Sequence, residues 1–182
     1  MHRNIYVGGT GKTPLAIKIS EILEKSKKNP AIIKKFYNNQ NDEMELIKNK
    51  NKNLVTDSTR KKALFKAIER KFDFMILDDG FQDHSIKKNL SILCFNSNQL
   101  AGNGFTIPSG PLREPLSSIK NCQMIMINGN RNKEFEKKIK EISNNNTSVY
   151  YSKYFPVNIK KLQNINLLVF AGIGNPENFF QL

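Results

Sequence analysis

A glycine-rich run near the start of the chain carries the residue types that bind polyphosphate. It reads Val7-Gly8-Gly9-Thr10-Gly11-Lys12-Thr13-Pro14. The backbone N–H groups of such a turn, together with the N-terminus of the helix that follows, point at one anion. We expect phosphate to be bound by Gly8, Gly9, Thr10, Gly11 and Lys12, and Mg²⁺ by the Thr13 hydroxyl.

The match to the full P-loop pattern is incomplete, because Tyr6 stands where the first glycine belongs. A glycine-rich turn that only begins an ordinary helix is therefore the alternative. That alternative gives no reason for the sequence Lys12-Thr13-Pro14 at the start of the helix. Phosphate binding remains the favoured interpretation.

Two carboxylates follow an apolar run in the middle of the chain. The run covers residues 74–77 and is typical of a parallel strand that is buried on both faces, and Asp78-Asp79-Gly80 comes directly after it. Carboxylates at the carboxyl end of a strand suit Mg²⁺ binding or catalysis in a protein with a phosphate-binding loop. The alternative is a simple Asp-Gly turn. The sequence does not divide the roles of Asp78 and Asp79.

Other segments supply alternating helices and strands. After the glycine-rich run, a helix is predicted up to Pro30, with an apolar face made of Leu15, Ile19, Ile22 and Leu23. A buried strand over residues 31–33 and a weak helix over residues 44–50 follow. Asp57 is a plausible N-cap for a helix over residues 58–71. Its inward face would contain Ala63, Leu64, Ala67 and Ile68.

The second half of the chain also contains predicted strands and a predicted helix. Strands are predicted at residues 90–95, 124–127, 149–151 and 167–170, and a charged surface helix at residues 132–142. The glycine- and proline-rich segment 102–115 fits neither state, and a loop of that length is usually functional or disordered. The order of elements predicts an α/β fold of the P-loop NTPase type, with a mostly parallel sheet flanked by helices.

The amino-acid composition gives information about the partners and the cellular environment of the chain. Of 182 residues, 29 are Lys or Arg and 16 are Asp or Glu, so the net charge is +13. This excess suggests an acidic partner, although much of it lies in Lys/Asn-rich stretches that biased nucleotide composition would equally explain. Cys94 and Cys122 are expected to be reduced thiols in the core. No apolar run approaches the roughly 20 residues of a membrane-spanning helix.

Four blocks of the chain resemble the tetraacyldisaccharide 4′-kinase family, the lipid A 4′-kinases. The first is residues 4–14 around the glycine-rich run, and the second is Asp78-Asp79-Gly80-Phe81-Gln82. The third is Gly102-Asn103-Gly104 followed by Pro108-Ser109-Gly110-Pro111-Leu112-Arg113-Glu114-Pro115. The fourth is Phe170-Ala171-Gly172-Ile173-Gly174-Asn175-Pro176-Glu177-Asn178-Phe179-Phe180. The first block occurs in many nucleotide-binding enzymes, whereas the second and third blocks together are specific to far fewer families.

The resemblance implies transfer of the ATP γ-phosphate, with Mg²⁺, to the 4′-hydroxyl of a tetraacyldisaccharide 1-phosphate in lipid A biosynthesis. It implies a peripheral position at the cytoplasmic face of the inner membrane, where a basic surface would meet anionic headgroups. Nucleic acid is not expected as a partner, and the sequence identifies no protein partner. Phe179 and Phe180 would contact acyl chains or, more simply, pack in a core.

The resemblance also implies roles for residues to which the sequence patterns alone assign no function. Asp42-Glu43 alone reads as an acidic pair at a helix N-terminus. The family pattern implies that Asp42 belongs to a general-base dyad and that Glu43 lies near Mg²⁺ with Asp79. Asp42, Asp78, Asp79 and Lys12 are then the expected catalytic residues. Gln82 and Arg113 are expected to contact substrate, and the Arg113 guanidinium suits a bidentate phosphate contact, to the transferred group or to the 1-phosphate.

Several positions depart from the family pattern. Lys34-Lys35-Phe36-Tyr37 stands where Ser-Arg-Gly-Tyr is usual, and Asp83 replaces a histidine, with His84 displaced by one and expected to be solvent-exposed. Residues 1–164 are predicted to form the kinase core and residues 165–182 the beginning of a second lobe. Both ends look shortened, so weak ATP binding and poor phosphorylation are expected. The alternative function is a P-loop NTPase acting as a nucleotide switch or a nucleic-acid-associated ATPase, which would leave the third block unexplained.

Overall fold

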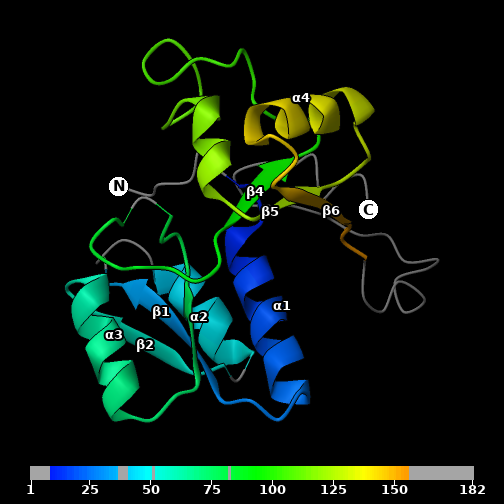
Figure 1. The fold of residues 1–182 in the computed structure, drawn as a ribbon. Helices are drawn as coiled ribbons and strands as arrows, with labels where there is room; N and C mark the ends of the chain where they lie inside the picture. The colour runs from blue at the N-terminus through cyan, green and yellow to red at the C-terminus, as the bar shows by residue number, and fades with distance from the viewer. Residues whose placement is uncertain (1–8, 37–40, 51, 82, 156–182) are drawn as a thin grey trace, which may run out of the picture. The chain divides into compact units, whose positions relative to one another are not determined.

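The chain forms two compact units, each built on a small parallel sheet. The computed structural model describes residues 9–36, 41–50, 52–81 and 83–155 (Figure 1). Among these, residues 11–89 belong to the first unit, and residues 9, 10 and 90–155 to the second.

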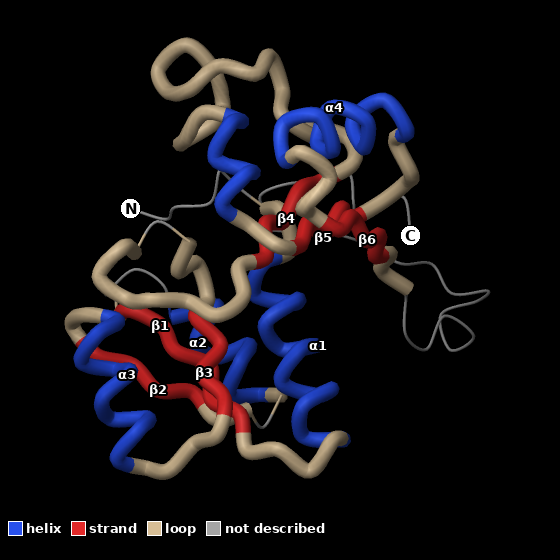
Figure 2. Tube along the Cα trace, viewed as in Figure 1, coloured by secondary structure: helices blue, strands red, loops and turns tan. Residues whose placement is uncertain are grey.

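The sheet of the first unit has the strand order β2-β1-β3, with all pairs parallel. Its strands are β1 (Pro30–Lys35), β2 (Leu54–Asp57) and β3 (Phe74–Leu77). Its helices are α1 (Lys12–Lys25), α2 (Asn41–Asn49) and α3 (Arg60–Glu69), as Figures 1 and 2 show. Ile33 of β1 is in register with Leu77 of β3, so both strands end at the same edge.

Alternation along the central strand β1 divides the core into two faces. Ala31 and Ile33 pack with Ala63 and Ala67 of α3. Ile32, which points the other way, packs with residues of α1 and α2, namely Ala16, Ile17 and Ile47. Because side chains of a strand alternate in direction, residue 34 belongs to the face covered by α1 and α2.

The first unit differs from the predictions at three points. Residues 54–57 form β2, which was not predicted, and Asp57 is its last residue rather than a helix cap. The N-cap of α3 is Thr59, whose Oγ1 accepts a hydrogen bond from the N–H of Lys62 at 3.2 Å. A four-residue strand beside a stronger helix pattern carries too little periodicity to be recognised. Ile68, predicted to face inward, is exposed.

The predicted buried faces of α1 and β3 also differ. The buried residues of α1 are Thr13, Ala16, Ile17 and Ser20, whereas Ile22 is 55% exposed. Three of these four side chains are small or polar, so the largest apolar residues of the helix do not mark its buried face. Phe74 is exposed and the rest of β3 is half-buried. Within the described residues β3 pairs with β1 alone, so it is an edge strand of the described sheet, and the prediction that it is buried on both faces is wrong.

The second unit has a parallel sheet of order β4-β5-β6. Its elements are β4 (Ile92–Asn96), the 3₁₀ helix η1 (Leu116–Asn121), β5 (Met124–Asn128), α4 (Lys133–Ser143) and β6 (Ser148–Ser152). Phe95 of β4 meets Phe135 of α4 edge to face, with ring centroids 5.2 Å apart. Asn132 caps α4 by accepting a hydrogen bond from the N–H of Phe135.

The predicted α/β class with parallel strands is confirmed. Cys94 and Cys122 are buried thiols that form no disulfide with a described residue, in agreement with the prediction of core thiols. Across the described ranges, no helix is both long and apolar enough to span a membrane. The strand predicted at residues 167–170, the side chains of Phe179 and Phe180, and the second lobe from residue 165 lie outside the described residues and stay predictions.

Candidate functional site

Four polar side chains from four elements meet at the carboxyl edge of the first sheet. They are Thr13 of α1, Lys34 of β1, Glu43 of α2, and Asp78, which directly follows β3. Lys34 and Asp78 are 3% and 2% exposed, so two opposite charges are buried here. We call these four residues the Lys34 cluster.

The strand pattern explains why these residues meet. Ile32 and Ile76 pack on the face that α1 and α2 cover, and Lys34 and Asp78 follow each of them by two positions. The backbone N–H of Asp78 donates to the carbonyl of Ile33 at 3.0 Å, which extends the pairing of β1 and β3 to this point. Two residues on one face at the ends of adjacent parallel strands must therefore lie side by side.

The carboxylate of Asp78 is the centre of the Lys34 cluster. Its Oδ2 accepts a hydrogen bond from Thr13 Oγ1 at 2.9 Å and another from Lys34 Nζ at 3.0 Å. Lys34 Nζ also donates to Oε2 of Glu43. The ammonium group thus bridges two carboxylates that are 35 residues apart in the sequence (43 and 78).

Electrostatics keep this lysine charged. Burial alone would lower the pKa of Lys34, but the charge of Asp78, with hydrogen bonds to Glu43 and Asp78, raises the pKa above its ordinary value. Removal of one partner from a buried ion pair typically costs about 3–5 kcal/mol, because the other charge stays buried. The Lys34 cluster therefore acts as one unit.

The N-terminus of α1 has the features of an anion site. Gly11, its N-cap, has φ 86°, in the left-handed region that glycine adopts without strain. Gly11 provides no side-chain cap, and the first turn of α1 contains no acidic residue. Lys12 is the first residue of α1 and is half-buried, and Thr10 is buried. Gly9 is exposed, and Gly8 lies outside the described residues.

The turn after β3 is tightly built. Asp79 has φ 58°, a conformation that Asp tolerates better than most residues. A Cβ atom on Gly80 would lie 2.6 Å from Cβ of Leu77, so only glycine fits. The Asp-Gly turn and the buried carboxylate are thus both present at this strand end.

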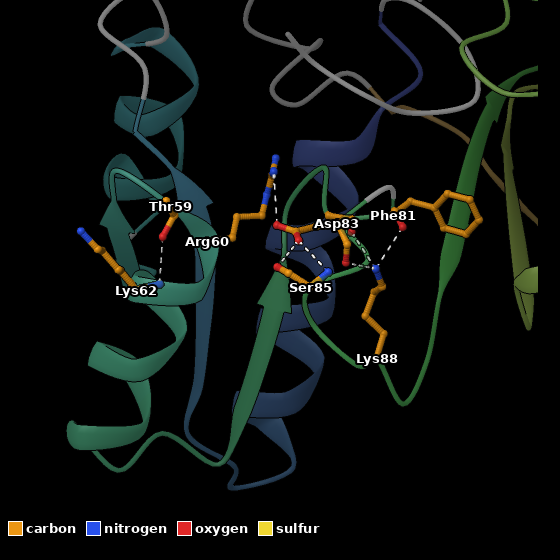
Figure 3. A network of polar contacts seen from close by, with 8 residues as sticks. Thr59, Arg60, Lys62, Phe81, Asp83, Ser85 and Lys88 are labelled. Atoms are coloured by element: carbon orange, nitrogen blue, oxygen red, sulfur yellow. Dashed lines mark hydrogen bonds and ion pairs between the residues drawn. The ribbon is translucent and has the colours of Figure 1, made fainter.

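The segment after this turn is held by Lys88, as Figure 3 shows. Lys88 Nζ donates to the carbonyls of Gly80, Phe81 and Asp83 at 3.1, 3.0 and 2.7 Å. Asp83 accepts hydrogen bonds from the backbone and hydroxyl of Ser85 and forms an ion pair with Arg60 at 4.0 Å. Gln82 lies outside the described residues.

His84 is exposed, as predicted. Its neighbour Asp83, which stands at the departure from the family pattern, has a local structural role. Burial alone would raise the pKa of Asp83, but hydrogen bonds from Ser85 and the charges of Arg60 and Lys88 lower the pKa below its ordinary value.

The two acidic residues at the start of α2 differ in their surroundings. Asp42 is exposed in the first turn, whereas Glu43 is half-buried and paired with Lys34. The hydrogen bonds of the Lys34 cluster thus include Glu43 and not Asp42. A role of Asp42 as a base stays a prediction.

Arg113 belongs to the second unit, at the end of an ordered loop. Thr106 and Leu112 form an isolated parallel bridge, and the N–H of Ile107 donates to the carbonyl of Leu112 at 2.7 Å. A Cβ atom on Gly110 would lie 2.3 Å from the carbonyl oxygen of Phe105, so glycine is required there. Arg113 follows the fully buried Leu112 and is itself half-buried.

The oxygen donors of the Lys34 cluster fit a hard cation such as Mg²⁺. The Thr13 hydroxyl donates a hydrogen bond to the Asp78 carboxylate, and the ammonium group of Lys34 connects Asp78 to the second carboxylate, that of Glu43. Hydroxyl and carboxylate oxygens are ligands of hard cations. The ammonium shows that positive charge is stabilised at this point. In the described part of the chain, no three His, Cys, Asp or Glu residues form a group that could hold a metal by themselves.

The sequence patterns do not identify Lys34 as a site residue, since in the sequence it marks only a departure from the family pattern. One signal was present: a lysine two positions after the inward-facing Ile32 of a buried strand. The pattern shows that such a side chain points into the protein. It does not show which carboxylates receive it.

Comparison with known proteins gives one family. The family model described as "Tetraacyldisaccharide-1-P 4'-kinase" matches residues 3–53 and 39–182. The tetraacyldisaccharide 4'-kinase of Pelagibacter ubique (strain HTCC1062) is 46% identical over 182 residues, which cover 98% of this chain and 57% of that relative.

More distant relatives carry the same name. The protein of Haemophilus influenzae (strain 86-028NP) is 28% identical, over 98% of this chain and 58% of its own length. That of Francisella tularensis subsp. novicida (strain U112) is 30% identical, over 98% and 64%. The chain thus spans somewhat over half the length of the curated relatives it matches. Because the family model matches nearly every residue, the chain belongs to the tetraacyldisaccharide-1-P 4'-kinase family.

Proposed function

We propose that this chain provides the nucleotide-binding part of an ATP-dependent kinase that phosphorylates the 4′-hydroxyl of a tetraacyldisaccharide 1-phosphate. Family membership and the names of its relatives support the substrate class. The observation that carries the proposal is the 2.9 Å hydrogen bond from Thr13 to Asp78, which joins the start of α1 to the end of β3. A hydroxyl after the phosphate-binding lysine and a strand-end aspartate are the groups that hold Mg²⁺ in P-loop enzymes.

Each residue of the site then has a proposed role. Lys12 and the N–H groups of the glycine-rich turn would neutralise the β- and γ-phosphates. Thr13 and Asp78, with Glu43 or Asp79, would hold Mg²⁺, which supplies positive charge to the phosphates when bound. A carboxylate, proposed to be Asp42, would accept the proton of the attacking hydroxyl. Arg113 and Gln82 are proposed to contact the lipid substrate.

The membrane setting is part of the proposal. The acceptor is a lipid, and the chain carries a net charge of +13. Both favour a peripheral position at the cytoplasmic face of the inner membrane, where basic residues near anionic headgroups each contribute about 1 kcal/mol.

ATP binding and phosphate transfer test this proposal in the 182-residue chain. Lys12→Met should weaken ATP binding by about tenfold or more, because a charge-assisted phosphate contact is lost. Lys18→Met is the matched control, since Lys18 is an exposed lysine of the same helix that pairs with Glu21. The measurements are titration with a fluorescent ATP analogue and transfer of radiolabelled γ-phosphate to the tetraacyldisaccharide 1-phosphate.

The outcomes distinguish a lipid kinase from a nucleic-acid-associated ATPase. Unchanged ATP binding in Lys12→Met would contradict the phosphate assignment. Nucleotide hydrolysis that is stimulated by DNA or RNA, with no transfer to the lipid, would favour a nucleic-acid-associated ATPase instead.

A further inference from the structure

The buried ammonium of Lys34 lies between the carboxylates of Asp78 and Glu43, which are among the groups proposed above to hold Mg²⁺. Lys34 Nζ donates to Oδ2 of Asp78, and the same oxygen accepts the hydroxyl hydrogen of Thr13. Lys34 Nζ also donates to Glu43 Oε2. The oxygens best suited to a metal are therefore those already neutralised by a lysine.

We propose that Lys34 is a resident cation of this site, which competes with divalent metal for the carboxylates of Asp78 and Glu43 and thereby keeps metal affinity low. The proposal rests on the proposed function in one respect, that these oxygens are the metal donors. It adds a residue that tunes the metal requirement of the site.

Charge and burial argue for competition rather than coexistence. A metal ion on Asp78 Oδ2 would lie within a few ångströms of an ammonium that is 3.0 Å from the same oxygen. Like charges at that range repel strongly where water is excluded, and the side chains of Lys34 and Asp78 are only 4% and 1% exposed. Metal binding therefore requires the lysine to move aside, and the free energy of that movement weakens the observed affinity.

Lys34 is also distinct from the exposed lysines of the chain. Lys18 and Lys66 form ion pairs with single carboxylates, with side chains 63% and 51% exposed. Lys34 instead bridges two carboxylates from different elements, and its position on the inward face of β1 leaves it directed at them. A general excess of basic residues does not account for this arrangement.

Metal binding without nucleotide tests the inference. Lys34→Met removes the charge and keeps an unbranched chain of similar length. We expect Mn²⁺, measured alone by electron paramagnetic resonance or calorimetry, to bind Lys34→Met about tenfold or more tightly than the unmodified chain. Lys66→Met, which removes a lysine from the Asp57 ion pair, is the matched control and should leave Mn²⁺ affinity unchanged.

Thermal unfolding gives a second readout that does not depend on activity. Without metal, Lys34→Met should unfold at a lower temperature, because Asp78 stays buried without its cation. Millimolar Mg²⁺ or Mn²⁺ should raise the unfolding temperature of Lys34→Met by clearly more than that of the unmodified chain. Addition of Asp78→Asn to Lys34→Met should abolish this metal-dependent gain.

Lys34→Ser is a second variant in case the methionine does not fold without metal. It leaves a hydroxyl and space for water between the carboxylates, and it should show the same gain in Mn²⁺ affinity. Mn²⁺ affinity within about twofold of the unmodified chain in both variants, with no metal-dependent stabilisation, would overturn the inference. These results are separate from the proposed function: loss of ATP binding in Lys12→Met could still be observed if the Lys34 variants failed this test.

Discussion

A single carboxylate, Asp78, connects the start of the first helix, the central strand and the second helix of the first unit. It accepts from Thr13 and Lys34, and Lys34 in turn pairs with Glu43. Its neighbour Asp79 begins the tight turn that follows, in a left-handed conformation. The two aspartates therefore have different surroundings, although they are adjacent in the sequence.

Asp57 illustrates a simpler charge pair on the surface. Lys66 Nζ lies 2.7 Å from its Oδ2, and the backbone and hydroxyl of Ser58 donate to Oδ1. The pairing with Lys66, helped by Ser58, lowers the pKa of Asp57 from 3.8 to about 2. Because the side chain of Lys66 is 51% exposed, solvent screens the pair and the energetic gain is modest.

The pKa shift of Asp57 predicts a dependence of stability on acid. A carboxyl whose pKa is lower in the folded state stabilises the fold fully above its unfolded pKa near 3.8, and loses that contribution as the pH falls through about 2. The unfolding temperature of Asp57→Asn should thus be below that of the unmodified chain at pH 6, and the difference should shrink between pH 4 and pH 2. Lys66→Met should show a similar shrinkage; a difference independent of pH would contradict this origin.

At the level of elements, the segment after β3 depends on a lysine rather than on regular structure. Three carbonyl groups that belong to no strand or helix accept from Lys88 (Figure 3). Such carbonyls would otherwise need water, and a charged donor stabilises them more than a neutral one. The segment that carries Asp79 and Gly80 is therefore fixed from its far end.

Substitution of Lys88 should loosen this segment selectively. Lys88→Met is expected to lower the free energy of unfolding by about 1.5–3 kcal/mol, the range for hydrogen bonds to a charged group. Amide hydrogen exchange should accelerate in residues 80–86 more than in β1. Lys87→Met changes an exposed neighbour and should alter stability by no more than about 0.5 kcal/mol. Equal effects of the two variants would show that the three hydrogen bonds contribute little.

For the whole molecule, the net charge of +13 is the feature with the broadest consequence. Described basic residues are distributed over both units, among them Lys61 and Lys62 in the first and Lys137 and Lys138 in the second, all of which are exposed. Many exposed cations with few anions between them favour association with an acidic surface.

Binding to anionic vesicles should therefore be electrostatic. The chain should sediment with vesicles containing phosphatidylglycerol at 50 mM salt, and less so at 500 mM, because the screening length falls from above 10 Å to a few ångströms. Vesicles of phosphatidylcholine alone are the control and should bind weakly. Binding that is insensitive to salt would contradict this prediction, and a marked preference for DNA over anionic vesicles would favour the nucleic-acid alternative.

Local sequence patterns determined much of this protein. The helix after the glycine-rich run, the strands at residues 30–35 and 124–128, and the carboxylates at the end of β3 were all predictable. These features depend on residues close together in the chain, where periodicity and turn chemistry act directly. The short strand β2 and the buried face of α1 were not predicted, because their apolar signal is weak or shared with polar residues.

The partners of the site were decided only by the tertiary structure. Lys34 and Asp78 are separated by 44 residues, and Thr13 and Asp78 by 65. Their contacts depend on the register of β1 with β3 and on which helices cover the Ile32 face of the sheet. Neither can be predicted from a short segment of the sequence. The sequence alone placed a phosphate-binding turn and two carboxylates in one chain. Only the packed sheet puts a buried lysine between the carboxylates of Asp78 and Glu43, because residues on one face at the ends of neighbouring parallel strands lie side by side.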